Sequence, residues 1–172
     1  IHRLRLPSIG EQTRLLSYFA GEKPDAVVME CMAVQPQYQW IAEHQMVQSH
    51  IGVITNVRPD HLDEMGTTLH DNAMSLSNTI PFNGKLVTSE KEMGSVLEQV
   101  SEKRNTEFNQ VEADEITPEY MGRFPYLEHR DNVALALKIC ELSGVEKETA
   151  LEGMVHTPPD PGATIIWELN CN

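Results

Sequence analysis

The residues best suited to chemistry lie in the stretch NVRPDHLDEMG (residues 56–66), where His61 stands between Asp60 and Asp63 after the apolar run IGVIT. An imidazole in this setting can bind a metal, transfer a proton or form hydrogen bonds with its neighbours. Asp60 and Asp63 could orient the ring as acceptors or cap a helix that begins there, and both roles are compatible. The stretch alone leaves these alternatives open.

Glu30 is the candidate partner of His61, because it ends the apolar run DAVVME about one strand–helix–strand crossover earlier in the chain. One carboxylate and one imidazole are too few for zinc, which takes three or four protein ligands. They suit Mg²⁺, which keeps water ligands and shares its coordination shell with substrate phosphates. On spacing alone the simpler alternative is favoured, in which Glu30 is a polar strand end and His61 a loop residue hydrogen-bonded by Asp60 or Asp63.

Composition indicates a soluble globular protein and argues against some partners. The chain of 172 residues fits one domain. Of these residues 40% are hydrophobic and 23% are charged. A formal net charge of −13 argues against a nucleic-acid surface, because phosphate backbones bind clustered Lys and Arg. No run approaches the roughly 20 apolar residues that a membrane helix needs. Cys31, Cys140 and Cys171 are widely spaced, which favours reduced thiols in a cytoplasmic protein.

Strand-like apolar runs alternate with helical patterns along the whole chain, which predicts a three-layer α/β fold with a mostly parallel sheet and helices on both faces. In open sheets of this kind ligands bind beyond the carboxyl ends of the strands, where Glu30 and residues 56–63 fall. The predicted strands cover residues 25–33, 51–57, 85–90, 106–113 and 164–169, and the strand over 51–57 is expected to be buried. The predicted helices cover residues 8–22, 36–50, 67–80, 89–103, 117–124, 130–144 and 146–157.

Residues with strong local preferences predict where several helices begin and end. Pro36 suits the first turn of its helix, and Thr67 or Thr68 can cap the helix that follows residue 66. Ser89 is expected to open the next amphipathic helix, and Gly144 to close the helix that begins at residue 130.

Two further patterns carry weaker information. His129 and Asn132 are three residues apart at a helix start and therefore share one face, with helix capping as the simpler role. The segment PPDPGA (residues 158–163) reads as a stiffened turn. No G-x-x-x-x-G-K-[ST], G-x-S-x-G or H-E-x-x-H pattern occurs in the sequence.

Five segments taken in order resemble a known family: SIGEQ (8–12), ECMAVQPQYQ (30–39), GVITNVRPDHLDEMG (52–66), RDNVALAL (130–137) and PPDPGA (158–163). Together they resemble the poly-γ-glutamate-synthesising branch of the Mur ligase-like superfamily, whose members form amide bonds with ATP. The pattern N-x-x-x-D-H-x-D is shared with the wider superfamily, whereas ECMAV and PPDPGA narrow the match to this branch.

The resemblance implies a role for individual residues. Glu30 and His61 match the magnesium ligands of the family, and Asn56 begins the motif that shapes the histidine loop. Asn132 matches an asparagine that contacts adenine, although His129 replaces the first asparagine of the usual N-x-x-N pattern. Asp60 and Asp63 are the candidate catalytic acids of the motif, which hold the histidine in place.

The chain also departs from the family pattern. The phosphate-binding loop G-x-x-G-K-[ST] lies upstream of SIGEQ in the family, and the family's C-terminal domain is not seen. The segment NAMSLSNT (72–79) offers no counterpart of the carbamylated lysine, and GATIIWEL (162–169) offers no arginine to hold ATP. The sequence also begins without methionine. We therefore expect residues 1–172 to be a partial central, ATP- and Mg²⁺-binding domain, without the P-loop strand.

The function implied for the parent protein is ATP-dependent polymerisation of glutamate through its γ-carboxyl groups, for capsule synthesis. ATP would phosphorylate the terminal carboxylate of a glutamate chain, and the amine of an incoming glutamate would displace the phosphate. ATP and Mg²⁺ are the implied cofactors, glutamate and poly-γ-glutamate the substrates, and membrane subunits of a capsule synthase complex the partners. The implied location is the cytoplasm at the inner face of the membrane. A homo-oligomer stays open, and the fragment alone is expected to be inactive.

Two alternatives belong to other functional classes. A non-catalytic scaffold or binding subunit would keep the fold without turnover, and the missing arginine favours it. A metal-dependent hydrolase lacks enough ligands. If the ligase hypothesis holds, the side chains of Glu30 and His61 should converge on one rim of the sheet, and the sheet edge left without its P-loop strand should be open or covered by a neighbouring chain.

Overall fold

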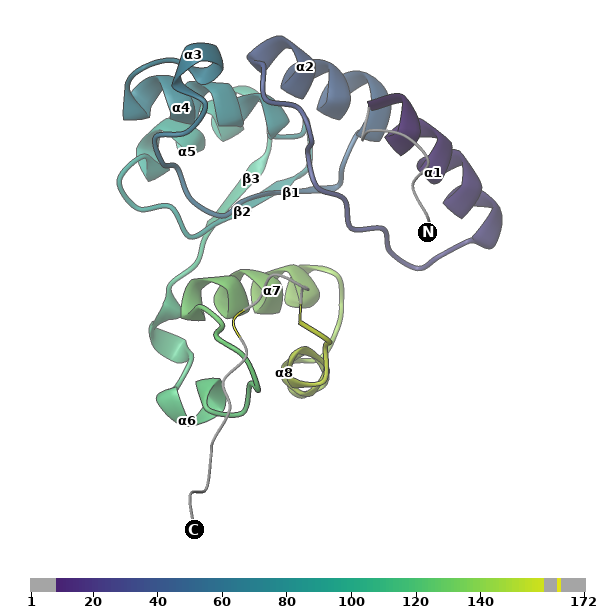
Figure 1. Cartoon of the computed structure of the whole chain (residues 1–172), viewed down its shortest axis with the longest axis vertical. Coiled ribbons are helices and arrows are strands. Elements are labelled where there is room, and N and C mark those ends of the chain that lie inside the picture. Colours follow the sequence, from purple (N-terminus) through teal and green to yellow (C-terminus); the bar gives the residue numbers. More distant parts are fainter. Residues whose placement is uncertain (1–8, 160–163, 165–172) are drawn as a thin grey trace.

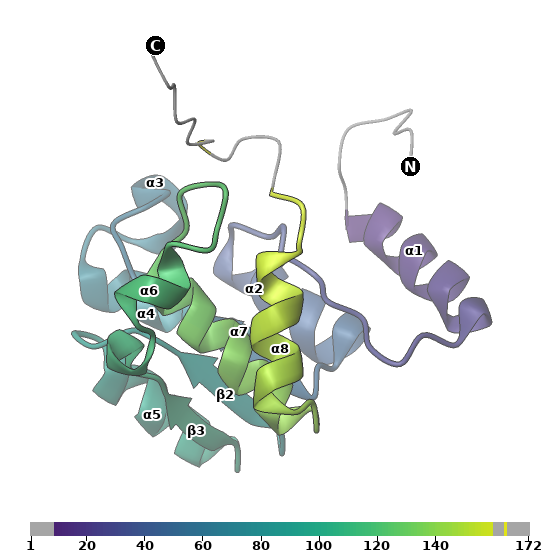
Figure 2. The same ribbon diagram turned by 90° about the horizontal axis from the view of Figure 1, so that it is seen from below.

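The protein folds around a small parallel sheet that helices cover on both faces (Figures 1 and 2), in a computed structural model that describes residues 9–159 and residue 164. The strand order is β1 (Ile51–Ile54), β2 (Lys85–Thr88), β3 (Glu107–Gln110), and both pairings are parallel. Helices α2, α4 and α5 lie on one face, and α6, α7 and α8 lie on the other. The predicted three-layer α/β fold is therefore confirmed.

The predicted helices occur in the predicted order, and the short helix α3 lies between two of them. The helices are α1 (Ile9–Glu22), α2 (Pro36–Ile41), which a π-helical stretch (Ala42–Val47) continues, α3 (Leu62–Met65), α4 (Leu69–Leu76), α5 (Gly94–Lys103), α6 (Pro118–Met121), α7 (Arg130–Leu142) and α8 (Lys147–Val155). Short 3₁₀ turns cover Ser77–Thr79 and Ala113–Glu115. Within the described part of the chain, no helix is both long and apolar enough to cross a membrane.

The central strand β2 explains why the sheet is covered twice. Its consecutive residues Leu86 and Val87 are both fully buried, and because side chains alternate along a strand they point to opposite faces. Leu86 belongs to the apolar cluster under α4 and α5, and Val87 to the cluster under α7. A strand that is apolar on both sides is typical of a parallel sheet between two helical layers.

Local capping residues act largely as predicted. Thr68 caps α4 in a reciprocal capping box with Asp71, and Pro36 occupies the first turn of α2. Gly144 follows α7 with a φ of 81°, a conformation that favours glycine. Ser89 does not open α5, because its hydroxyl donates instead to the carbonyl of Thr55, and the helix begins only at Gly94.

Two strand predictions need correction. Residues 25–33 form no strand: the segment contains neither helix nor strand, and Val28 is 95% exposed. A strand must pair its backbone groups with a neighbour, so apolar composition alone cannot produce one. The strand predicted to be buried, β1, lies at the edge of the described sheet and leaves Val53 42% exposed. Apart from Thr164, the strand predicted over 164–169 lies outside the described residues, as does Ser8.

Candidate functional site

His61 lies where the sequence places it, just beyond the carboxyl end of β1 and directly before α3. Its backbone has φ 43° and ψ 50°, the left-handed conformation that non-glycine residues seldom adopt. Its side chain is about half exposed (53%) and can therefore face a ligand. A strained backbone persists only where surrounding contacts hold it, so the neighbours of His61 decide how well the imidazole is positioned.

Asp60 contacts His61 mainly through the backbone. Its Oδ1 accepts a hydrogen bond of 2.8 Å from the His61 backbone N–H and lies 3.7 Å from Nε2 of the ring. The second distance is too long for a hydrogen bond but close enough for electrostatic attraction to a protonated imidazole. Asp63 lies in the first turn of α3, where a carboxylate favours the free backbone N–H groups. Asp63 thus lies where a helix-start role is expected, whereas Asp60 lies beside the ring and bonds the backbone of His61.

Asn72 on α4 holds this loop from Asp60 onward, and no sequence motif indicates it. Its side chain is fully buried (0% exposed). Oδ1 accepts from the Asp60 backbone N–H at 3.2 Å, and Nδ2 donates to the carbonyls of Gly66 and Thr68 at 3.0 Å each. One buried amide therefore holds both ends of the segment that carries His61. A polar residue on the apolar face of α4, next to Ala73, was the available hint.

Asn56 lies in the same loop with an exposed side chain. The residues on either side of it are fixed to the neighbouring strand end: the Thr55 carbonyl accepts from Ser89, and the Val57 backbone N–H donates to Glu90. The loop position of Asn56 is therefore set by the carboxyl end of β2, and the loop-shaping role of its side chain stays a prediction.

Glu30 lies in the segment without helix or strand, and its side chain is exposed. Among the described residues, no group of three or more His, Cys, Asp or Glu side chains could hold a metal ion. A zinc-type cluster is therefore absent from this part of the chain. A carboxylate and an imidazole, completed by water and phosphate oxygens, remain compatible with Mg²⁺. The convergence of Glu30 and His61 stays a prediction.

Asn132 lies near the carboxyl ends of the strands as well, on a helix of the opposite layer. It lies in the first turn of α7, where its Nδ2 donates to Glu128 at 2.9 Å. The neighbouring Arg130 donates to the carbonyl of Asp114, which follows β3. The beginning of α7 therefore lies beside the carboxyl end of β3. The contact with Glu128 joins two side chains and does not cap the helix, and the exposed side chain of Asn132 is accessible to a ligand.

Charged side chains also gather beyond the carboxyl ends of the strands. A hydrogen bond and charge attraction from Glu112, followed by the charges of Asp114 and Asp131, raise the pKa of Lys91. Lys91 follows β2, Glu112 and Asp114 follow β3, and Asp131 begins α7. Three elements thus bring their polar residues together beyond the strand ends, as expected of a ligand-binding edge in a parallel sheet.

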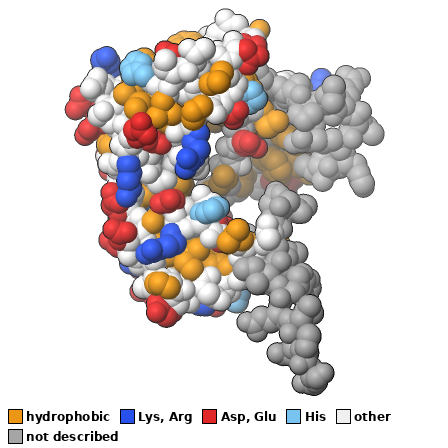
Figure 3. Space-filling view, turned by 60° about the vertical axis from the view of Figure 1, so that its left-hand side comes forward, with side chains coloured by type: hydrophobic (Ala, Val, Ile, Leu, Met, Phe, Trp, Pro, Cys, Tyr) orange, Lys and Arg blue, Asp and Glu red, His pale blue; other side chains and the backbone are white. Residues whose placement is uncertain are grey.

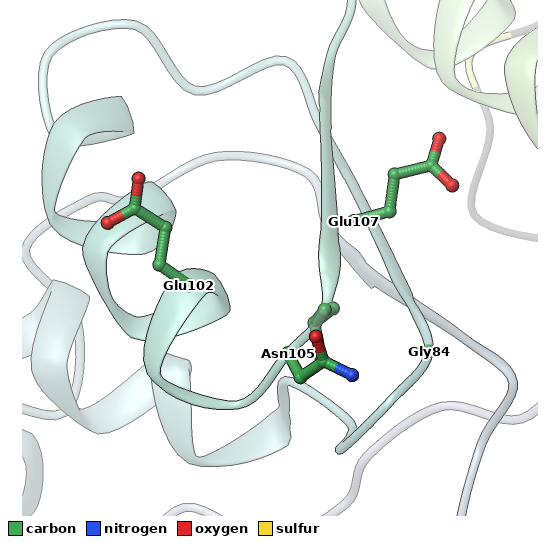
Figure 4. Close-up of a pocket in the computed structure, with 5 residues that line it drawn as sticks. Gly84, Glu102, Asn105 and Glu107 are labelled. Carbon is green, nitrogen blue, oxygen red and sulfur yellow. The ribbon is translucent and has the colours of Figure 1, made fainter.

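A hollow of about 470 Å³ lies at the other end of the strands, beside the amino-terminal ends of β2 and β3 (Figure 4). Gly84, Glu102, Asn105, Thr106 and Glu107 line it. The carboxylates of Glu102 and Glu107 point away from each other, and none of the lining residues is basic. An open, acidic hollow of this kind does not suit a nucleotide, so the strand-end loops remain the candidate site.

Three comparisons with known proteins bear on the family and the fold of the chain. The sequence profile of the Mur ligase middle domain matches residues 6–146. The chain is 44% identical over 160 residues to the capsule biosynthesis protein CapB of Bacillus anthracis, and 42% identical over 163 residues to the PGA synthase CapB of Bacillus subtilis (strain 168). These alignments cover 93% and 95% of the chain but 34% and 42% of the relatives, so the chain spans less than half their length.

A solved structure supports the fold. E. coli FolC in complex with DHPP and ADP matches with a TM-score of 0.55 over 68% of this chain and 32% of that chain. The sequence identity is 17%, so the match concerns the arrangement of strands and helices alone.

Proposed function

The chain belongs to the Mur ligase family, and on that premise we propose that it is the Mg²⁺- and nucleotide-binding part of an ATP-dependent amide ligase that polymerises glutamate through γ-carboxyl linkages. The observation that carries the proposal is the motif N-x-x-x-D-H-x-D at residues 56–63, on a loop held at the carboxyl end of β1. The similarity to two CapB proteins, one of them named a PGA synthase, supports glutamate as the substrate.

The proposed reaction has two steps. The terminal carboxylate of a glutamate chain attacks the γ-phosphorus of ATP, which gives an acyl phosphate and ADP. The amine of the incoming glutamate then attacks the acyl carbon, phosphate leaves, and the amine proton passes to a base or to water. ATP is consumed because a free carboxylate is a poor acyl donor, and phosphorylation turns its oxygen into a good leaving group.

Negative charge is the main obstacle for such a site. The chain carries a formal net charge of −13, and on the face seen in Figure 3 the Lys and Arg side chains are scattered among acidic ones. Glu30 and His61 would hold the Mg²⁺, which when bound offsets the charge between nucleotide phosphates and carboxylate. Asp60 would keep His61 in place, Asn56 would shape the loop, and Asn132 would contact adenine.

The parent protein is further proposed to act at the inner face of the cell membrane with membrane subunits of a capsule synthase. The name of the Bacillus anthracis relative, a capsule biosynthesis protein, supports the role in capsule synthesis. Co-purification of the native protein from detergent-solubilised membranes tests it. Recovery of the protein in the soluble fraction alone, without membrane partners, would contradict it.

The test of the chemistry is trapping of the acyl phosphate in the longest natural protein that contains this chain. With ATP, Mg²⁺ and a short γ-glutamyl peptide, hydroxylamine should convert the acyl phosphate into a hydroxamate, and ADP release should depend on the peptide. Omission of Mg²⁺ is the control and should abolish both signals. If Mg·ATP binds but neither hydroxamate nor peptide-dependent ADP appears, the protein is a scaffold of this fold rather than a ligase.

A further inference from the structure

Glu90 is a buried carboxylate at the carboxyl end of β2, with 7% of its surface exposed. Both of its side-chain oxygens accept backbone hydrogen bonds: Oε2 from Val57 at 2.6 Å and Oε1 from Met93 at 2.9 Å. Val57 lies 33 residues away in the loop after β1, and Met93 immediately precedes α5. One side chain therefore joins the histidine loop to the beginning of a helix.

The backbone of Glu90 is held equally well. Its N–H donates to Oγ1 of Thr88, the last residue of β2, at 3.0 Å. Its carbonyl accepts from Nε2 of Gln110, the last residue of β3, at 2.6 Å. With Val57 from the β1 side, the carboxyl ends of all three described strands meet at Glu90. The carboxylate consequently has little freedom to move.

The bond to Val57 sets the start of the loop that carries the candidate ligands. Val57 is itself buried and packs in the same apolar cluster as Ile54. Asn56 directly precedes Val57, and His61 follows four residues later. Glu90 thus holds the loop at its beginning, as Asn72 holds it from Asp60 onward.

We infer that Glu90 is a positioning residue for the proposed Mg²⁺–nucleotide site, an inference that rests on the proposed function. It acts through the backbone of Val57 rather than as a metal ligand, because its side chain is buried and each of its oxygens accepts a backbone N–H. A carboxylate is needed here because it can accept from two donors at once. In the variant Glu90→Gln one oxygen becomes an NH₂ group, which meets a backbone N–H donor to donor.

The test compares Glu90→Gln with Glu92→Gln, a matched change at an exposed residue two positions away. Amide hydrogen exchange of Val57 should accelerate in Glu90→Gln, because its acceptor is weakened or lost. The Mg²⁺ concentration for half-maximal ADP release should rise about 10- to 100-fold, the range typical of groups that support a metal ligand. At saturating Mg²⁺, kcat should fall by less than about threefold, because excess metal restores occupancy. Glu92→Gln should match the wild type in all three measurements.

Each outcome has a defined meaning. Faster Val57 exchange with an unchanged Mg²⁺ midpoint would overturn the inference and leave Glu90 a purely structural residue. If the wild type binds Mg·ADP but turns over no ATP, the ligase proposal fails, and the Mg²⁺ dependence of ADP binding measured by calorimetry decides the role of Glu90. If the wild type does not bind Mg·ADP, both fail. Should Glu90→Gln not fold, Glu90→Asp retains the charge with a shorter reach and should give a smaller shift of the same sign.

Discussion

The two residues proposed to hold Mg²⁺ lie in regions that the chain stabilises very differently. His61 lies on a loop fixed by the buried side chains of Asn72 and Glu90. Glu30 lies in residues 25–34, which contain no helix or strand and expose large apolar side chains such as Val28. The backbone that carries the imidazole is therefore preorganised by hydrogen bonds within the chain, whereas the segment that carries the carboxylate contains no helix or strand.

This difference has an energetic consequence. A preorganised ligand costs little conformational entropy when it binds, whereas ordering a flexible side chain costs about 0.5–1.5 kcal/mol. The His61 loop has met this cost on folding, through buried hydrogen bonds that each contribute about 1 kcal/mol. The Glu30 segment contains no helix or strand and is mostly exposed, so more of its order should depend on what binds beside it.

The largest expected effect is the loss of activity in His61→Ala of the longest natural protein that contains this chain. Removal of a metal ligand leaves phosphoryl charge uncompensated, an effect of several kcal/mol, which corresponds to about 100-fold or more in turnover. The free energy of unfolding should change by less than about 0.5 kcal/mol, as for an exposed loop residue. ADP release and urea denaturation measure the two quantities.

His70→Ala, an exposed histidine on α4, is the matched control and should retain wild-type turnover. Turnover of His61→Ala within about threefold of the wild type at limiting Mg²⁺ would show that the metal role of His61 is wrong.

The second prediction concerns the free energy of unfolding rather than turnover, and it compares the two regions directly. Asn72→Ala should lower the free energy of unfolding by about 1–3 kcal/mol, because the Asp60 N–H and the Gly66 carbonyl lose their side-chain partner. The Thr68 carbonyl keeps its bond from the backbone N–H of residue 72. A change in the other region, Val28→Ser, should cost less than about 0.5 kcal/mol, because Val28 is almost wholly exposed. Urea denaturation of both variants measures the contrast. Equal effects would mean that the loop is not the better-stabilised half of the site.

The same contrast explains what sequence patterns can predict. Strands β1 to β3 and helices such as α4 and α7 follow from apolar periodicity and from caps such as Thr68, which are local features. The position of His61 beyond a strand end follows from the alternation of strands and helices. These predictions succeed because each depends on a few neighbouring residues.

The failures depend on distant partners instead. Residues 25–33 have the composition of a strand, but a strand forms only where another strand pairs with it. Asn72 and Glu90 hold the loop because they are buried opposite particular backbone groups, 12 residues apart for Asn72 and Asp60 and 33 for Glu90 and Val57. The residue types alone, asparagine and glutamate, do not distinguish these buried positions from exposed ones.

The third prediction concerns ligand binding and has a moderate expected size. Saturating Mg²⁺ with a non-hydrolysable ATP analogue should slow amide exchange over residues 25–34 by about tenfold, if ordering that segment contributes roughly 1.4 kcal/mol. Exchange of the loop over residues 56–66 should slow less, because it is already held. Mass spectrometry of exchanged peptides measures both. The analogue without Mg²⁺ is the control, and a larger change in the loop would reverse the comparison.

The smallest expected effect is a pH dependence of the stability at the cap of α4, which follows the loop that carries His61. The Asp71 carboxylate accepts a hydrogen bond from the Thr68 backbone N–H at 3.1 Å, opposite the bond from its own N–H to the Thr68 hydroxyl. Hydrogen bonding to the Thr68 side chain and then to its backbone lowers the pKa of Asp71. A carboxyl whose pKa is lower in the folded state stabilises the fold fully above its unfolded value, near 3.8, and loses this contribution as the pH falls through the folded pKa.

Asp71→Asn tests this because it removes the titrating group but keeps an acceptor oxygen for Thr68. The wild type should be slightly more stable than Asp71→Asn near neutral pH, and the difference should shrink as the pH is lowered below 4. Urea midpoints between about pH 7 and pH 2.5 measure it. Asp25→Asn, in the exposed segment, is the control and should show no comparable convergence. A difference that stays constant across this range would mean that the α4 cap works through geometry alone, and that the charge of Asp71 contributes nothing to holding the loop beside it.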